Sequence, residues 1–161
     1  MKLENADRKI LRHSIATVAY RGAKTLRNAP DGFGGFKIGE STKTPLEILG
    51  HIGDLFDWAL SLVAGKESWD DTNPLPWDQE IERFFFSLRL FDDYLKSNGP
   101  FFVSAERLFQ GPIADALTHI GQIAMLRRLY GLPIKGENYF KAEIQTGRFE
   151  LEQSDPSHEF D

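Results

Sequence analysis

The stretch that decides the fold is residues 44–64, which read TPLEILGHIGDLFDWALSLVA. Thr44, Pro45 and Glu47 predict the start of a helix, because a Thr-x-x-Glu capping box satisfies free amide groups and proline fits the first turn. Two apolar stripes follow at spacings of three and four residues, and Gly65 ends the segment. A helix with apolar residues on two sides packs against more than one neighbour. We therefore expect this helix inside a bundle.

Three further segments share this helical periodicity, at residues 5–26, 78–97 and 112–130. A Gly/Phe-rich loop at residues 31–39 lies in a long connection after the first helix, long enough to cross the bundle. Residues 132–161 look mostly irregular, with a weak helical pattern near 139–144, and no alternating strand pattern stands out. The expected fold class is all-α, an antiparallel four-helix bundle with a long crossover loop.

The composition indicates one soluble domain followed by an acidic tail. The chain has 161 residues, 27% of them charged, and no cysteine, which excludes thiolate metal sites and disulfides. The net charge of −5 comes from residues 150–161, which hold five acids and no Lys or Arg. We expect residues 1–149 to form the bundle domain and residues 150–161 to be a solvated, flexible tail.

Several partners are not expected from this sequence. No basic block suggests nucleic-acid binding, and no apolar run is long enough for a membrane span. The N-terminus has no apolar signal region, so a cytoplasmic location is expected. The second apolar stripe of the helix at 44–64 favours a homodimer. An interaction module is a third possibility, resting on four phenylalanines that could equally be core: Phe33, Phe36, Phe101 and Phe102.

Of the four histidines, His51 and His119 have the most informative surroundings. His13 and His158 are expected at the surface. His51 falls within an apolar stripe, where a buried imidazole needs a polar partner. Asp54, three residues later, is a candidate to orient the His51 ring behind a metal ion.

The last predicted helix carries a second polar group. Asp115, His119 and Gln122 lie on one stripe, and two ligands at i and i+4 on a helix face can chelate a metal. Together with His51, Asp115 and His119 would supply two imidazoles and one carboxylate. This ligand set suits Zn, Ni, Fe(II) or Mn and leaves coordination positions open for water or substrate. The same spacing also fits an ordinary helix-stabilising pair, with Asp115 favoured by the helix dipole.

Two segments resemble the DinB/YfiT-like superfamily: LEILGHIGD at residues 46–54 and DALTHIGQIAMLRRLYG at residues 115–131. The resemblance covers most of residues 5–131 and implies a four-helix bundle with a long crossover. It implies that His51 and His119 match two family histidines that hold a divalent metal, with Gln122 beside them. The third family histidine falls at Asp115, a departure that changes the charge of the site and shifts its preference toward harder ions.

The resemblance implies two kinds of function. Members include metal-dependent thiol S-transferases, isomerases and hydrolases, so one hypothesis is an enzyme that activates a thiol or water with a metal held by His51, Asp115 and His119. The other hypothesis is a non-catalytic bundle that binds a small ligand or partner, with a degenerate metal site. Equilibrium binding of divalent ions separates the two hypotheses.

Overall fold

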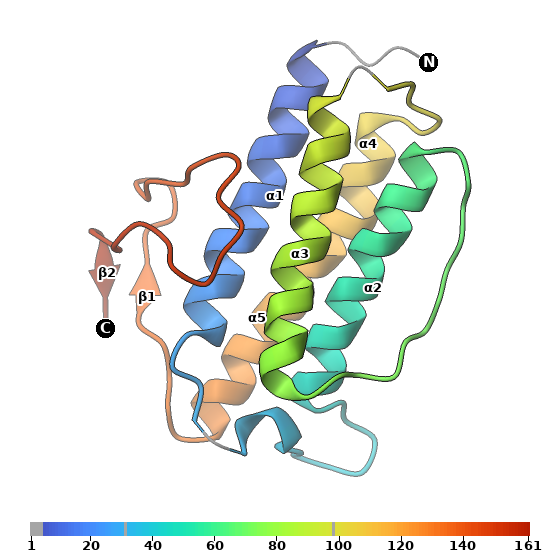
Figure 1. Cartoon of the computed structure of the whole chain (residues 1–161). Helices are drawn as coiled ribbons and strands as arrows, with labels where there is room; N and C mark the ends of the chain where they lie inside the picture. The colour runs from blue at the N-terminus through green and yellow to red at the C-terminus, as the bar shows by residue number, and fades with distance from the viewer. Residues whose placement is uncertain (1–4, 31, 98) are drawn as a thin grey trace.

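Four long helices pack around one apolar core in the computed structural model of the chain (Figure 1). The structure describes residues 5–30, 32–97 and 99–161. The all-α expectation is confirmed, and none of the helices in these ranges is long and apolar enough to cross a membrane. The long helices are α1 (Asn5–Leu26), α2 (Pro45–Val63), α3 (Trp77–Lys96) and α5 (Ala114–Leu129). The shorter elements are η1 (Phe33–Gly35), α4 (Ala105–Leu108), η2 (Phe109–Ile113), β1 (Gly136–Glu137) and β2 (Glu159–Phe160).

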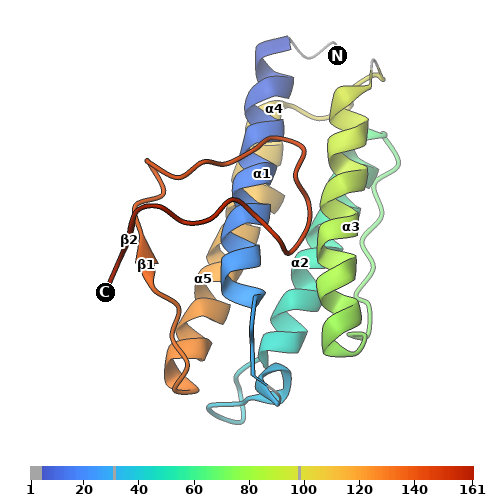
Figure 2. The same cartoon turned by 60° about the vertical axis from the view of Figure 1, so that its left-hand side comes forward.

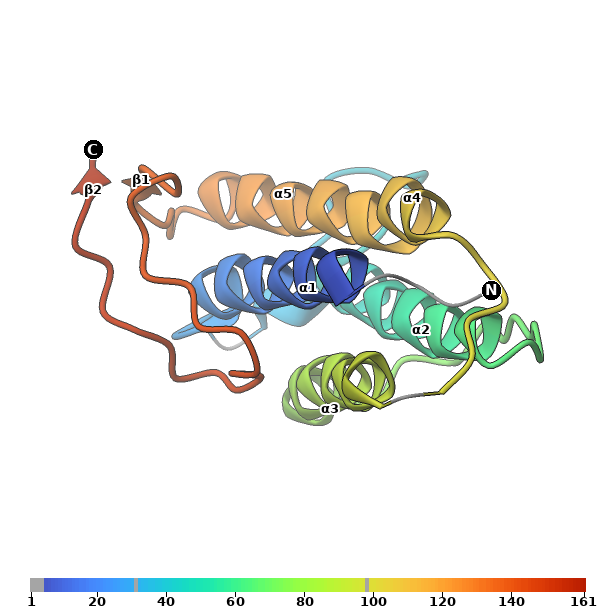
Figure 3. The same ribbon diagram turned by 90° about the horizontal axis from the view of Figure 1, so that it is seen from above.

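The first connection crosses the bundle. α1 and α2 each pack on both α3 and α5, which places α1 and α2 on opposite corners. The view from above shows α1 and α2 separated in this way (Figure 3). Residues 27–44 therefore run from one corner to the diagonal one, as the length of this connection suggested.

The second connection makes α2 and α3 parallel, and here the antiparallel expectation is wrong. Residues 64–76 leave the end of α2 and return along the outside of the bundle to the start of α3 (Figures 1 and 2). An extended segment of about 13 residues reaches about 43 Å, which exceeds the roughly 30 Å length of a 20-residue helix. The linker is thus long enough to bring α3 back to the starting end of α2.

Local sequence features explain how the helices begin and meet. At the start of α2 the Thr44 side chain accepts a hydrogen bond from the Glu47 amide, and Glu47 accepts one from the Thr44 amide, which confirms the capping box. Between α1 and α3, a Cβ on Gly22 would lie 2.6 Å from the ring of Phe84. Glycine at this position therefore lets the Phe84 ring pack directly on the α1 backbone.

The last bundle helix begins earlier than expected. Helical structure starts at Ala105 and continues through α4 and η2 into α5, with a kink at Gly111 (φ −90°, ψ −105°). Pro112 follows this kink and lies within η2, a wider π-type turn. Such turns locally change the direction of side chains along a helix. The kink lies one turn before Asp115, so it sets how α5 presents its first polar residue.

The phenylalanines proposed as an interaction surface are mostly core. Phe33 and Phe101 are fully buried, and Phe36 is partly buried against Tyr130. Phe102 is 65% exposed. The four residues therefore do not form a common exposed patch, and this support for an interaction module is lost.

The C-terminal segment differs from the expected flexible tail. The acids of residues 150–161 are exposed, but Gln153 is buried and donates to the Arg148 and Glu150 carbonyls. The segment packs along α1, where Glu159 pairs with Lys24 at 2.7 Å, and β2 pairs with β1. Turns and bends replace the short helix expected at 139–144. Lys24 of α1 and Arg27, which follows α1, hold the segment against the bundle, the latter by donating to the Leu151 carbonyl, and the Gln153 bonds fix its local shape.

Candidate metal centre

His51, Asp115 and His119 converge between α2 and α5, as the sequence predicted. α2 and α5 pack against each other and run in opposite directions. The preceding η2 lies beside the second half of α2, where Gly111 is close to the Trp58 ring, so the start of α5 lies beside His51. His51 Nε2 lies 4.0 Å from Asp115 Oδ2, and His119 Nε2 lies 3.5 Å from Asp115 Oδ1. The two imidazole rings are perpendicular, with centroids 4.8 Å apart. Asp115 is thus flanked by both histidines.

Gln122 orients the His119 ring, which agrees with its expected supporting role. His119 Nδ1 and Gln122 Oε1 are 3.0 Å apart. Because the amide oxygen only accepts, this contact favours the tautomer in which Nδ1 carries the proton. The Nε2 lone pair then points toward Asp115 and is available for a metal ion.

His51 lies in a less polar environment than the other two residues. Its side chain is 24% exposed and contacts Trp69 edge to face, with centroids 5.6 Å apart; Trp69 in turn contacts Trp58. Burial lowers the pKa of His51, the nearby His119 and Lys43 lower it further, and Asp115 and Asp54 oppose the shift. The imidazole is therefore neutral near pH 7, as a metal ligand must be.

Asp54 has a different role from the one expected. Its carboxylate accepts hydrogen bonds from the Thr72 amide (3.3 Å) and the Thr72 hydroxyl (2.6 Å), and it pairs with Arg83. Arg83 also binds Asp57 at 2.9 Å and Glu80 at 3.4 Å. Asp54 therefore attaches the returning linker and α3 to α2, and both of its oxygens have partners in Thr72 and Arg83.

The side chains of His51, Asp115 and His119 are of the types that bind divalent ions, and their ligand atoms need only a small movement to reach one ion. Their ligand atoms all lie within 4.8 Å of one another. Metal–ligand bonds of about 2.1 Å allow at most about 4.2 Å between two ligands of one ion. Small side-chain rotations close this gap, because the Asp115 side chain is 47% exposed and unconstrained on its outer side. That open side would face water or substrate.

The sequence pattern gives no sign that Trp69 lies beside His51. Trp69 belongs to the linker at 64–76, which is held along α2 by two hydrogen bonds between Ser61 and Ser68. No helical spacing relates Trp69 to His51, so only the return path of the linker brings them together. The other histidines lie where expected, since His13 and His158 are exposed.

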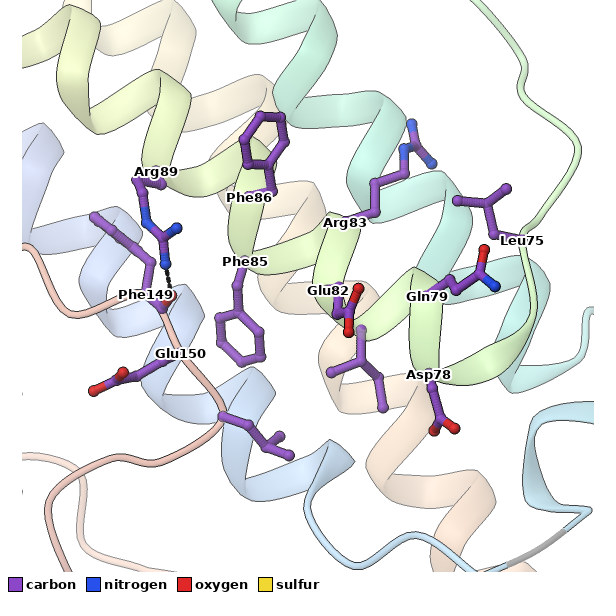
Figure 4. Close-up of a pocket in the computed structure, with 12 residues that line it drawn as sticks. Leu75, Asp78, Gln79, Glu82, Arg83, Phe85, Phe86, Arg89, Phe149 and Glu150 are labelled. Carbon is purple, nitrogen blue, oxygen red and sulfur yellow. Dashed lines mark hydrogen bonds between the residues drawn. The ribbon is translucent and has the colours of Figure 1, made fainter.

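A cavity on the surface of α3 is separate from this cluster. It measures about 810 Å³ and runs along the outer face of α3, beside Phe85, Phe86 and the Phe149–Leu151 segment (Figure 4). The Arg89 side chain, which lines it, donates to the Phe149 carbonyl at 2.9 Å. Neither histidine of the cluster lines this cavity, which is an open groove on the surface of the bundle.

Comparisons with protein-family models, with curated proteins and with solved structures give no match for this chain.

Proposed function

We propose that this protein is a divalent-metal-dependent enzyme of the thiol S-transferase or hydrolase type, with the ion held by His51, Asp115 and His119. The observation that carries the proposal is the convergence of two imidazoles on one carboxylate from two separate helices. The resemblance of residues 46–54 and 115–131 to the DinB/YfiT-like superfamily supports the same site and the same bundle class.

The residues around the site would divide the work of holding the ion. Two neutral imidazoles and one carboxylate resemble the donor sets that bind Zn or Fe(II) and leave coordination positions open. A divalent ion in such a site lowers the pKa of a thiol or water, which then acts as a nucleophile at neutral pH. Gln122 fixes the His119 ring, and Trp69 shields the His51 ring from water. The exposed side of Asp115 leaves room for substrate.

A non-catalytic bundle is the second candidate, favoured by one specific observation. Asp115 is already 3.5 Å from His119 on its own helix and 4.0 Å from His51 across the interface. With the His51 and His119 rings in contact across the interface, at a centroid distance of 4.8 Å, the cluster would pack α2 on α5 without any ion. Under this hypothesis, Asp115 is a structural partner that has replaced a metal-binding histidine of the DinB/YfiT-like family.

Isothermal titration with Zn, Ni and Mn tests the proposal. The wild type should bind one ion per chain with a Kd well below about a millimolar, and His51→Ala or His119→Ala should abolish this binding. Asp115→His should tighten binding of Ni or Zn, because imidazole is the softer ligand. His13→Ala, an exposed histidine on α1, is the matched control and should behave as wild type.

Absence of binding to the wild type, or unchanged affinity in both histidine variants, would refute the metal site and favour the non-catalytic bundle. If the ion binds, consumption of a small thiol in the presence of an aryl halide would identify the transferase reaction. Hydrolysis of an activated ester would identify the hydrolase reaction. Either activity should disappear in His119→Ala.

A further inference from the structure

A second candidate site lies away from the His51–Asp115–His119 cluster, in a cavity lined by several positively charged side chains. It measures about 220 Å³ and forms where the ends of α1 and α5 meet the C-terminal segment. None of the three candidate metal ligands lines it. Among the described residues that do, four are cationic and one is a carboxylate: Lys24, Arg27, Arg127, Lys135 and Glu159.

Only Lys24 has its charge balanced by acids. Its Nζ donates to Glu137 at 2.8 Å and to Glu159 at 2.7 Å. These two hydrogen bonds and the negative charges raise the pKa of Lys24 although burial acts in the opposite direction. The single carboxylate that lines the cavity is therefore already used.

Arg127 is buried and bonded only to backbone carbonyls. Its Nη1 donates to the Thr25 and Arg27 carbonyls at 2.9 and 2.7 Å, and its Nε donates to the Leu132 carbonyl at 3.1 Å. These bonds join the ends of α1 and α5, and the carbonyl dipoles offset part of the charge. No carboxylate pairs with Arg127 among the described residues, and burial lowers its pKa.

Arg27 and Lys135 are even less satisfied. Arg27 Nη2 donates to the Leu151 carbonyl at 3.0 Å, whereas its Nε is buried without a hydrogen-bond partner. Lys135 makes no ion pair within the described part of the chain. A buried polar atom without a partner, such as the Arg27 Nε, is rare, whereas Lys135 is exposed to water. Three of the four cations around this cavity thus lack an acidic partner.

In another cation-rich cavity of the same protein, two of the four cations are paired with a buried acid. It measures about 640 Å³ and is lined by Arg8, Lys9, Arg12 and Lys96. There Arg12 and Lys96 share the buried carboxylate of Asp92, at 2.7 and 2.8 Å. Within the described chain, Arg8 donates only to the Leu95, Ser97 and Gly99 carbonyls, so a shortage of acids alone does not set the smaller cavity apart. What distinguishes the smaller cavity among the described residues is the buried Nε of Arg27, which has no hydrogen-bond partner.

We propose that the cavity formed by Arg27, Arg127 and Lys135 binds a small polyanion that carries phosphate or carboxylate groups. Arg27 and Lys135 would donate directly to the anion, and Ser154 and the buried Arg127, which line the same cavity, would add a hydroxyl and further positive charge. The volume is below the roughly 300–1,000 Å³ of sites for drug-sized ligands, which limits the occupant to a compact anion. This site is independent of the metal proposal.

Isothermal titration with inorganic phosphate and with citrate tests the site, at constant ionic strength set by sodium chloride. We expect saturable binding of one anion per chain, by phosphate, by citrate or by both, and the stronger probe indicates the chemistry of the natural ligand. Lys135→Gln and Arg27→Gln should each weaken binding about tenfold, the usual effect of losing one charge-assisted hydrogen bond. Arg27→Lys should retain most of the affinity.

Lys9→Gln is the matched control, because it removes one exposed lysine from the other cation-rich cavity. It should leave the affinity unchanged. Lys135 is exposed, so its replacement should not disturb folding, and this can be checked by circular dichroism. Failure of both anions to bind the wild type would refute the proposal. It would also be refuted if Lys9→Gln weakened binding as much as Lys135→Gln and Arg27→Gln.

Discussion

Replacing Asp54 with alanine should destabilise the fold while leaving the proposed metal site intact. Asp54 is buried and accepts two hydrogen bonds from Thr72 and one from Arg83. Removing one partner of a buried ion pair costs about 3–5 kcal/mol. Arg83 keeps Asp57 and Glu80 as partners, which places the expected loss near the lower limit, about 3 kcal/mol. A loss of this size lowers the Tm by about 6–12 °C in a domain of this length.

Thermal and guanidinium unfolding followed by circular dichroism measure this change. Asp57→Ala is the matched control, because Asp57 binds the same guanidinium but its side chain is 53% exposed. An exposed pair contributes below about 1 kcal/mol, so this variant should unfold close to wild type. Equal losses in the two variants would refute the role of burial. A loss of metal affinity beyond about threefold in folded Asp54→Ala would instead show that Asp54 orients His51, since second-shell partners change affinity by 10–100-fold.

Three further predictions concern the site and the fold. Gln122→Leu should weaken Zn or Ni binding by about 10–100-fold, because the His119 ring loses the hydrogen bond that orients it. The Tm should change little, since Gln122 is exposed. Unchanged affinity in titration would contradict this prediction. Because the pKa of His51 is lowered in the folded chain, the unfolded chain takes up the proton first, so the free energy of unfolding without metal should fall as the pH drops below about 6.5. Guanidinium unfolding should show that His51→Phe removes part of this pH dependence. The same slope of unfolding free energy against pH in the wild type and in His51→Phe would argue against this role of His51. Phe149→Ala should cost about 3–5 kcal/mol in free energy of unfolding if the C-terminal segment docks as described, and a loss below about 1 kcal/mol would mean that it does not.

The sequence predicted the helices well because local chemistry determines them. The capping box at Thr44 and Glu47 places the start of α2, and the apolar spacing of three and four residues marks each long helix. The meeting of His51 with His119 was also predictable, because both lie on helix faces that point toward the core. Gln122 follows from the same reasoning, one turn after His119.

The remaining features depend on the path of the chain in three dimensions. The parallel α2–α3 pair follows from where residues 64–76 return, and composition indicated only a loop there. Asp54 lies three residues after His51, yet Arg83 from α3 takes its carboxylate, and helical periodicity gives no information about that neighbour. The docking of Phe149 and Gln153 was hidden by the acidic charge of the surrounding residues.

The position of a bound metal ion tests the proposed site of His51, Asp115 and His119 most directly. Crystals grown with Zn or Ni, measured on both sides of the absorption edge of the metal, should give one anomalous peak between α2 and α5. We expect this peak about 2.1 Å from Nε2 of both His51 and His119 and from one oxygen of Asp115. An empty site at full metal loading, or a peak bound only by exposed residues such as His13 or His158, would contradict it.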